Sequence, residues 1–155
     1  MKQLSKSHFT SAKGYLRVKE ERKIMGMNNH PFIVSLRCAF QCDNYLYYVM
    51  DLAEGGELFT MLKAKGKFDE ETVKLYAAEI VLALEYLHNN KILYSDLKLE
   101  NLLIDADGHI LLTDFGLSQI EKGTFEAYGT REYMAPEAIL KRPVTMAVDW
   151  WAMVS

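Results

Sequence analysis

Mostly apolar side chains recur at helical spacing in the first part of the chain, ahead of a cluster of turn residues. The side chains that share one helical face are Val18, Glu21, Ile24 and Met25. The pattern stops at residues 28–31, Asn-Asn-His-Pro, because proline cannot continue a helix. We therefore predict a helix that ends at this cluster.

Two runs of strand type follow this helix. Residues 32–40 and 45–50 are rich in apolar, β-branched and aromatic side chains, and residues 42–44, Cys-Asp-Asn, suit a turn between them. From the Gly-Gly pair at 55–56 the pattern becomes helical, first over residues 57–65. The first third of the chain is thus predicted to mix strands with a helix.

A longer helix is predicted to begin after Asp69, a residue type that caps helix N-termini. Its predicted buried stripe consists of Val73, Tyr76, Ala77, Ile80, Leu84 and Leu87. Residues 102–104 and 110–112 then flank a turn in which Gly108 suits a positive φ, so they predict a hairpin. Residues 145–155 favour one more helix.

Composition and charge are those of a soluble globular protein. At 155 residues, with 50% hydrophobic and 25% charged residues, the chain is long enough for one ordinary domain. A net charge of −3 gives no general attraction to nucleic acid or to an anionic membrane, although a local basic patch remains possible. No apolar stretch suits a secretory signal or a membrane span, so we expect a cytoplasmic or nuclear protein. Cys38 and Cys42 lack the companions of a zinc site and are expected to be reduced thiols.

Two short segments carry residues suited to phosphoryl transfer, one reading Tyr-Ser-Asp-Leu-Lys-Leu-Glu-Asn and the other Thr-Asp-Phe-Gly. In the first segment, Asp96 can accept the proton of an attacking hydroxyl, and Lys98 can neutralise charge on the moving phosphoryl group. The Asn101 amide oxygen and the Asp114 carboxylate are hard donors that suit Mg²⁺. Either segment alone would be an ordinary loop or turn, but together and in this order they favour the chemistry.

Two further segments support this interpretation. Residues 129–137, Gly-Thr-Arg-Glu-Tyr-Met-Ala-Pro-Glu, lie where a protein kinase keeps its substrate-docking segment, and Asp-Trp-Trp at 149–151 opens the last predicted helix. With these motifs the whole chain resembles the AGC group of Ser/Thr protein kinases, which includes cyclic-nucleotide-dependent, Akt-like and ribosomal-protein kinases. The segments most specific to that group are residues 30–34, 55–59, 97–101 and 149–152.

The resemblance implies an α+β, protein-kinase-like fold that is partial. A small strand-and-helix lobe with the hinge would occupy residues 1–53, and a mainly helical lobe would occupy residues 54–155. The chain begins at the strand that carries the phosphate-gripping lysine. We therefore expect the glycine-rich loop and the last helices of a complete kinase to lie outside this chain.

The resemblance also implies a site for ATP and Mg²⁺. Lys2 matches the lysine that grips the α- and β-phosphates, and Glu21 matches its helical partner, although both could be ordinary surface charges. Met50 would be the gatekeeper, and the hinge backbone from residue 51 to residue 53 would meet adenine. Apolar residues at such positions would equally suit a plain core. The implied nucleotide-site residues are Lys2, Glu21, Met50, Asp51, Ala53, Glu57, Leu103 and Thr113.

The implied partner is a protein substrate that carries a Ser or Thr hydroxyl. Glu57 and Glu100 match carboxylates that, in family members with basic substrates, attract arginines upstream of the phosphorylated residue. Thr130 resembles the threonine that bridges the catalytic Asp and Lys in Ser/Thr kinases, and Glu137 ends the docking segment. No nucleic-acid or membrane partner is expected.

Two positions depart from the family pattern. Ser95 stands where regulated relatives carry an arginine that holds a phosphorylated residue of the activation segment. Glu126 stands where that phosphorylated residue belongs, so the switch and its socket have both changed. A phosphate on the nearby Thr124 would need another cation, for which Lys122 is the candidate.

Three hypotheses follow from these patterns. The first is a Ser/Thr kinase that favours basic sequence contexts and is free of activation-segment phosphorylation. The second is a non-catalytic, pseudokinase-type binding module, because the control device is lost at Ser95 and Glu126 and the glycine-rich loop is not expected within this chain. The third is a gene-model fragment that does not fold alone, which a melt without a cooperative transition would reveal.

Overall fold

The computed structural model describes residues 1–9 and 11–155. The strands are β1 (Lys2–Ser5), β2 (Leu36–Gln41), β3 (Tyr45–Met50), β4 (Gly56–Glu57), β5 (Ile92–Leu93), β6 (Leu102–Ile104), β7 (Ile110–Leu112) and β8 (Gln119–Ile120). The α-helices are α1 (Ala12–Met27), α2 (Leu58–Lys65), α3 (Glu70–Asn89), α4 (Pro136–Ile139) and α5 (Ala147–Val154). Short 3₁₀ helices span Lys6–His8, Leu99–Asn101 and Arg131–Tyr133.

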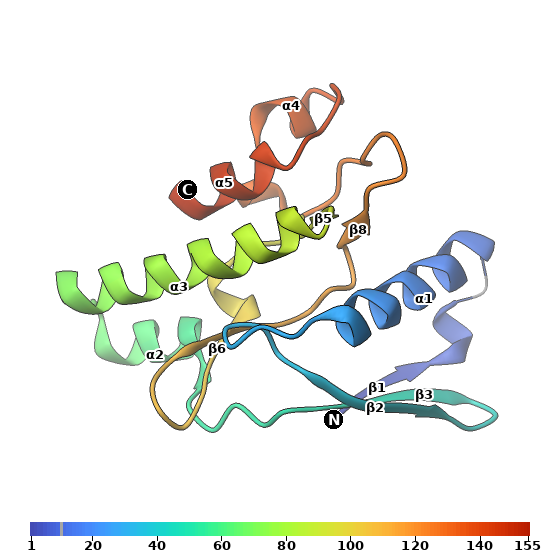
Figure 1. Ribbon diagram of the computed structural model, residues 1–155, viewed down its shortest axis with the longest axis horizontal. Helices are drawn as coiled ribbons and strands as arrows, with labels where there is room; N and C mark the ends of the chain where they lie inside the picture. The colour runs from blue at the N-terminus through green and yellow to red at the C-terminus, as the bar shows by residue number, and fades with distance from the viewer. Residues whose placement is uncertain (10) are drawn as a thin grey trace.

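The first third of the chain forms a three-stranded antiparallel sheet, in the order β1-β3-β2, with α1 packed against it (Figure 1). Ser11 caps helix α1: its hydroxyl accepts a hydrogen bond from the Gly14 N–H and so satisfies one free helix donor. The buried Tyr48 of β3 donates to the Val18 carbonyl at 3.1 Å and ties the sheet to the helix. The predicted helical face is confirmed: the buried residues of α1 are Val18, Glu21, Ile24 and Met25.

The predicted strand over residues 32–40 is wrong in its first part, since β2 begins only at Leu36. The preceding backbone pairs with β7 instead: the Val34 N–H donates to the Leu112 carbonyl at 3.0 Å, and the Leu112 N–H donates to the Phe32 carbonyl at 2.9 Å. The Val34 N–H and the Phe32 carbonyl therefore bond to β7 rather than extending β2 toward residue 32. Residues 32–34 thus connect the first sheet to the hairpin of β6 and β7.

Helix α3 has the predicted cap, because Asp69 accepts a hydrogen bond from the Thr72 N–H at 2.8 Å. Leu84 and Leu87 of its predicted stripe are fully buried. Val73 was expected there too but is 50% exposed, because the first turn of α3 projects past the elements that cover the rest of the helix (Figure 1). Tyr76, Ala77 and Ile80 are half-buried, and Glu79 and Ala83 are buried without having been predicted.

The remaining predicted elements are confirmed. Strands β6 and β7 form the expected hairpin, and Gly108 in its turn has φ +90°. The predicted helices at 57–65 and 145–155 appear as α2 and α5, and the turn before β3 closes with a hydrogen bond from the Cys42 N–H to the Tyr45 carbonyl. Both cysteines are free and exposed. The mixed helix and strand content agrees with the expected partial kinase-like α+β fold.

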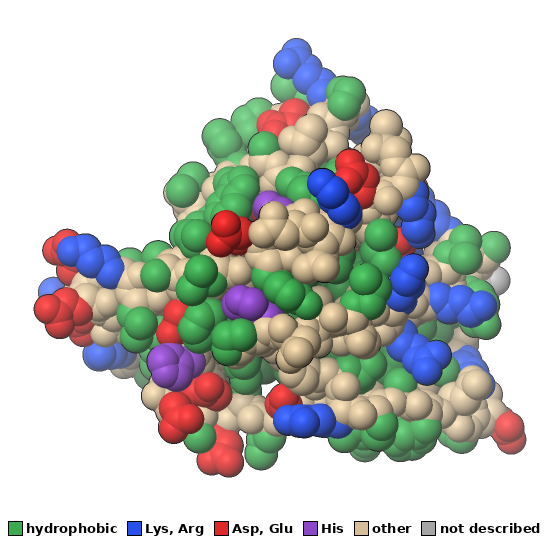
Figure 2. Space-filling view, in the orientation of Figure 1, with side chains coloured by type: hydrophobic (Ala, Val, Ile, Leu, Met, Phe, Trp, Pro, Cys, Tyr) green, Lys and Arg blue, Asp and Glu red, His purple; other side chains and the backbone are tan. Residues whose placement is uncertain are grey.

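The surface has a clear distribution of charge. Side chains of Lys and Arg gather over α1, and acidic side chains gather at the start of α3 and at the turn between β6 and β7 (Figure 2). This cluster over α1 is a local basic patch, which the negative net charge of the whole chain did not exclude. None of the helices in the described part of the chain has the length and apolar character needed to span a bilayer. The division at residue 53 and a cytoplasmic or nuclear location stay predictions.

The buried Glu79 links the middle of α3 to β7 and predicts a dependence of stability on pH. Its carboxylate accepts from the Ile110 N–H at 2.9 Å and from His109 Nδ1 at 2.6 Å. The hydrogen bond and charge of Glu79 raise the pKa of His109 above 6.5. A group whose pKa is raised by folding stabilises the folded state fully below its unfolded pKa, and this stabilisation disappears as pH rises through the folded pKa.

We expect the His109 ring to titrate above 6.5 when its NMR signals are followed against pH. We also expect the melting temperature of the wild type to fall, relative to that of a His109→Gln variant, as pH rises through that pKa. A pKa of His109 at or below 6.5 would contradict the contact between His109 and Glu79.

Candidate active site

The loop that carries the first motif begins directly after β5 and is held by Asp149 of α5. The Asp149 carboxylate is 1% exposed and accepts from the backbone N–H groups of Tyr94, at 2.9 Å, and Ser95, at 2.8 Å. His88 Nε2 lies 2.8 Å from the same carboxylate. Ser95 has φ +76°, a conformation that costs energy for a non-glycine residue, and the two hydrogen bonds help to hold it. Sequence analysis missed this supporting role of Asp149.

Asp96 is the most highly bonded carboxylate of the loop. Thr130 donates its hydroxyl to Asp96 Oδ1 at 2.6 Å and its backbone N–H at 2.9 Å. Lys98 Nζ lies 3.0 Å from Asp96 Oδ2 and donates to the Thr130 hydroxyl at 2.7 Å. Burial alone would raise the pKa of Asp96, but the hydrogen bonds from Thr130 and Lys98 outweigh it and lower this pKa below 3.8. Asp96 is therefore an ionised hydrogen-bond acceptor at neutral pH.

Asn101 connects this loop to the second motif. Its Nδ2 donates to the Asp96 carbonyl at 2.9 Å and to Asp96 Oδ2 at 3.1 Å, and its own carbonyl accepts from the Thr113 N–H at 3.0 Å. Because both side-chain bonds use Nδ2, the amide oxygen remains available as a ligand. Asp114 follows Thr113 and has φ +56° and a half-exposed carboxylate. Two oxygen donors of the kind that Mg²⁺ prefers are thus held by one connected network, which fits the expected metal.

Lys2 joins the N-terminal sheet to α1 and to the second motif. Its Nζ lies 2.8 Å from Glu21 Oε1 and 3.0 Å from Asp114 Oδ1. Burial disfavours the charged amine, yet the charges and hydrogen bonds of Glu21 and Asp114 outweigh burial and raise the pKa of Lys2 above 10.5. Burial also raises the pKa of Glu21 above 4.5. The ammonium group is therefore positioned beside the candidate metal-binding carboxylate.

A small open pocket surrounds this ion pair. Its lining residues are Lys2, Glu21, Met25, Met50, Thr113 and Asp114. Met50 and Thr113 thus line the same small pocket as the ion pair of Lys2 and Glu21, and their contact with a nucleotide stays a prediction. Leu103 is half-buried in β6, opposite Glu57 of β4.

The expected hinge leaves β3 beside β2. The Asp51 N–H donates to the Ser35 carbonyl at 3.2 Å, and the Asp51 carboxylate pairs with Arg37. The Ala53 carbonyl accepts from the Gly56 N–H at 3.4 Å, a long bond that a better donor could replace. Within this segment Leu52 is 79% exposed, whereas Asp51 and Ala53 are half-buried.

The predicted substrate-side residues do not all meet at one place. Thr130 lies at Asp96, whereas Glu57 and Glu100 are exposed, the first ahead of α2 and the second in the 3₁₀ helix before β6. Glu137 is half-buried in α4, and no ion pair of Glu137 is found among the described residues. Of this set, Thr130 is therefore the residue that bonds to Asp96, and Glu100 lies in the loop segment itself.

Both altered positions contact Gln119 of β8. Glu126 Oε2 pairs with Lys13 of α1 at 2.6 Å, and the Ser95 hydroxyl lies 3.4 Å from the amide nitrogen of Gln119. Lys122 pairs with Glu20 at 2.7 Å, so this lysine is already engaged rather than reserved for a phosphate on Thr124. Sequence analysis did not identify Lys13 or Gln119.

Comparison with known families and proteins agrees with this geometry. A family model described as "Protein kinase domain" matches residues 1–154. The chain is 49% identical over 99% of its length to "Protein kinase 2" of Dictyostelium discoideum and covers 33% of that protein. It is 49% identical over 99% of its length to the "cAMP-dependent protein kinase catalytic subunit" of the same organism, of which it covers 24%. It is also 50% identical over 88% of its length to human "Ribosomal protein S6 kinase alpha-3", of which it covers 19%. The chain thus spans a third or less of the length of these relatives.

Proposed function

The chain belongs to the protein kinase domain family, in its AGC group, and we propose that it transfers the γ-phosphoryl group of ATP to Ser or Thr side chains of proteins. The observation that carries the proposal is the connected network of Lys2, Asp96, Asn101 and Asp114. Phosphoryl transfer requires that a hydroxyl and a phosphate be held in line while the negative charge of the phosphate oxygens is neutralised. The residues of this network supply those functions.

Each residue of the network has a separate role in the proposed reaction. Asp96 accepts a hydrogen bond from the substrate hydroxyl, orients it and takes up its proton. Lys98 neutralises negative charge beside Asp96, and Thr130 holds both side chains in position. The role of Thr130 favours Ser and Thr substrates over Tyr by resemblance to the family.

The nucleotide and the metal would be held on the other side of the same network. Asn101 and Asp114 would hold Mg²⁺, which supplies neutralisation of the phosphate oxygens when bound. Lys2 would bind the α- and β-phosphates, and Glu21 orients Lys2 for that contact. Met50, the backbone of 51–53 and Leu103 would contact the adenine ring. A preference for basic sequence contexts would rest on Glu57 and Glu100, which are both exposed and free to meet arginines.

Replacement of Asp114 tests the nucleotide side of the proposal. We expect Asp114→Asn to raise the Mg²⁺ concentration needed for ATP binding by at least about tenfold, since loss of even an outer partner of a metal ligand commonly costs 10–100-fold. The measurement is a calorimetric titration of ATP at several Mg²⁺ concentrations.

Asp107→Asn is the matched control for this experiment. Asp107 is exposed in the turn between β6 and β7, so its replacement removes the same charge at a distance from the site. The Mg²⁺ requirement of this control should equal that of the wild type. An unchanged Mg²⁺ requirement in Asp114→Asn would refute the assignment of Asp114 to the metal.

A binding module without catalysis is the second candidate function. The observation in its favour is the loss of the arginine–phosphate control pair at Ser95 and Glu126. Binding of magnesium-ATP without any transfer to a Ser or Thr peptide would support it, and measurable transfer would exclude it.

A further inference from the structure

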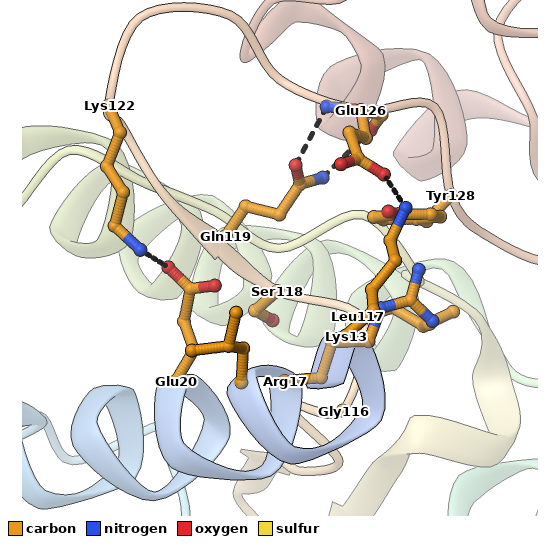
Figure 3. A pocket seen from close by; sticks show the side chains of 11 residues that line it. Lys13, Arg17, Glu20, Gly116, Leu117, Ser118, Gln119, Lys122, Glu126 and Tyr128 are labelled. Atoms are coloured by element: carbon orange, nitrogen blue, oxygen red, sulfur yellow. Dashed lines mark hydrogen bonds and ion pairs between the residues drawn. The ribbon is translucent and has the colours of Figure 1, made fainter. Parts of the chain in front are cut away.

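One face of α1 contacts the segment that follows the second motif. Residues at the spacing i, i+4 and i+7, namely Lys13, Arg17 and Glu20, point to this segment (Figure 3). Lys13 Nζ lies 2.6 Å from Glu126 Oε2, and Glu20 Oε1 lies 2.7 Å from Lys122 Nζ. These ion pairs with Lys122 and Glu126 thus hold α1 against the segment without a phosphate.

Aromatic stacking adds to these ion pairs. The guanidinium carbon of Arg17 lies 4.0 Å from the centre of the Tyr128 ring, within the range of a cation–π contact. Lys13 Nζ lies 5.6 Å from the same ring. Tyr128 is two residues beyond Glu126, so its contact with Arg17 and the ion pair of Glu126 hold the same stretch of backbone against α1.

Gln119 occupies the space between the two positions at which the family pattern is broken. Its side-chain amide binds both backbone groups of Glu126, donating to the carbonyl at 2.8 Å and accepting from the N–H at 2.8 Å (Figure 3). The same amide nitrogen lies 3.4 Å from the Ser95 hydroxyl. Gln119 is itself anchored, because it pairs with Leu93 at the start of the catalytic loop. An uncharged clamp therefore stands where an arginine and a phosphate would otherwise meet.

The exposure of the ion pair and the number of hydrogen bonds made by Gln119 favour the Gln119 clamp as the principal contact. Lys13 and Glu126 are 64% and 56% exposed, and an ion pair between side chains this exposed adds little to stability because water screens it. Gln119 makes two hydrogen bonds of 2.8 Å to the backbone of one residue, so it fixes both the position and the orientation of that residue. The ion pair therefore orients α1, while Gln119 holds the segment.

We infer that Gln119, Lys13 and Glu126 form a phosphate-independent latch that positions Glu21 of α1 on Lys2. Lys13, Arg17 and Glu20 lie on the same helix as Glu21, and a helix transmits the position of one turn to the next. The inference rests on the proposed function, because its consequence is the affinity of Lys2 for nucleotide phosphates. These residues are positioning residues and do not touch the substrate.

Charge reversal tests the ion pair of the latch. In phosphatase-treated protein, we expect Lys13→Glu and Glu126→Lys each to weaken magnesium-ATP binding about fivefold, as loss of about 1 kcal/mol implies. The double variant, which restores an opposite-charge pair, should return to within about twofold of wild type. In a Glu21→Gln background the reversal at Lys13 should add less than about twofold, because the latch acts through Glu21.

One further variant tests the Gln119 clamp, and two variants of an unrelated ion pair serve as controls. Gln119→Ala should weaken magnesium-ATP binding about tenfold, and no reversal at Lys13 or Glu126 should repair it. The reversals Lys74→Glu and Glu70→Lys on α3, a similarly exposed pair at 2.6 Å, should leave binding unchanged. Melting temperatures of all variants show whether any effect is general destabilisation.

The outcomes separate this inference from the proposed function. Wild-type binding in Gln119→Ala and in both single reversals would overturn the latch, as would loss of wild-type binding after phosphatase treatment. Absence of phosphate transfer, with binding still dependent on the latch, would refute the catalytic proposal alone. Absence of magnesium-ATP binding by the wild type would overturn both.

Discussion

Asp96→Asn is expected to lower the turnover number for phosphate transfer by about 10²–10⁴-fold, the usual contribution of a positioned proton acceptor. An amide keeps the size of the side chain and can still accept from Thr130, but it cannot take up a proton. It also removes the anion that pairs with Lys98 at 3.0 Å. The measurement is the rate of transfer to a basic peptide that contains one Ser, with magnesium-ATP at saturation.

The interpretation of this variant requires two accompanying measurements. Magnesium-ATP affinity should change little in Asp96→Asn, because Lys2 and Asp114 are intact, and a cooperative melt shows that the fold persists. Asp107→Asn, which neutralises an exposed turn residue, should retain wild-type turnover. Unchanged turnover in Asp96→Asn would remove Asp96 from the reaction.

Asp149→Ala is expected to lower the free energy of unfolding by about 3–5 kcal/mol, the range found when one partner of a buried, hydrogen-bonded charge is removed. The carboxylate is 1% exposed and accepts from the buried backbone N–H of Tyr94 and the partly buried backbone N–H of Ser95. Alanine leaves both donors and the ring of His88 without that partner. The loop that carries Asp96 would lose its support at the same time.

Urea denaturation of wild type and Asp149→Ala measures this change. A loss of this size is a large share of the 5–15 kcal/mol typical of natural domains, so the midpoint should move clearly. Asp107→Ala is the matched control, and a change within about 0.5 kcal/mol is expected for an exposed turn residue. A similarly small change in Asp149→Ala would contradict the supporting role.

The parts of the fold that were predictable from sequence are those fixed by local patterns. The buried face of α1, the cap at Asp69 and the hairpin turn at Gly108 each depend on residues within a few positions of one another. The first part of the predicted strand at 32–40 failed because its partner, Leu112, lies in a distant segment. Periodicity describes one element at a time and cannot identify such a partner.

The candidate site divides in the same way. The motif around Asp96 and the carboxylate of Asp114 were recognisable because residue type and spacing carry the chemistry. The supporting roles of Asp149 and Gln119 were not, since each depends on backbone groups that only the fold brings near. A polar residue on a buried helical face, as at Glu79, is a signal that could have indicated one such contact.

Transfer of phosphate to a peptide by the wild-type chain is the most direct test of the proposed function. The measurement is the mass of a basic peptide with a single Ser after incubation with ATP and Mg²⁺, beside the same peptide with Ala in place of Ser and a sample with the metal chelated. The account predicts one added phosphate on the Ser peptide alone, only when Mg²⁺ is present. Binding of magnesium-ATP by a folded chain with no added phosphate would contradict it.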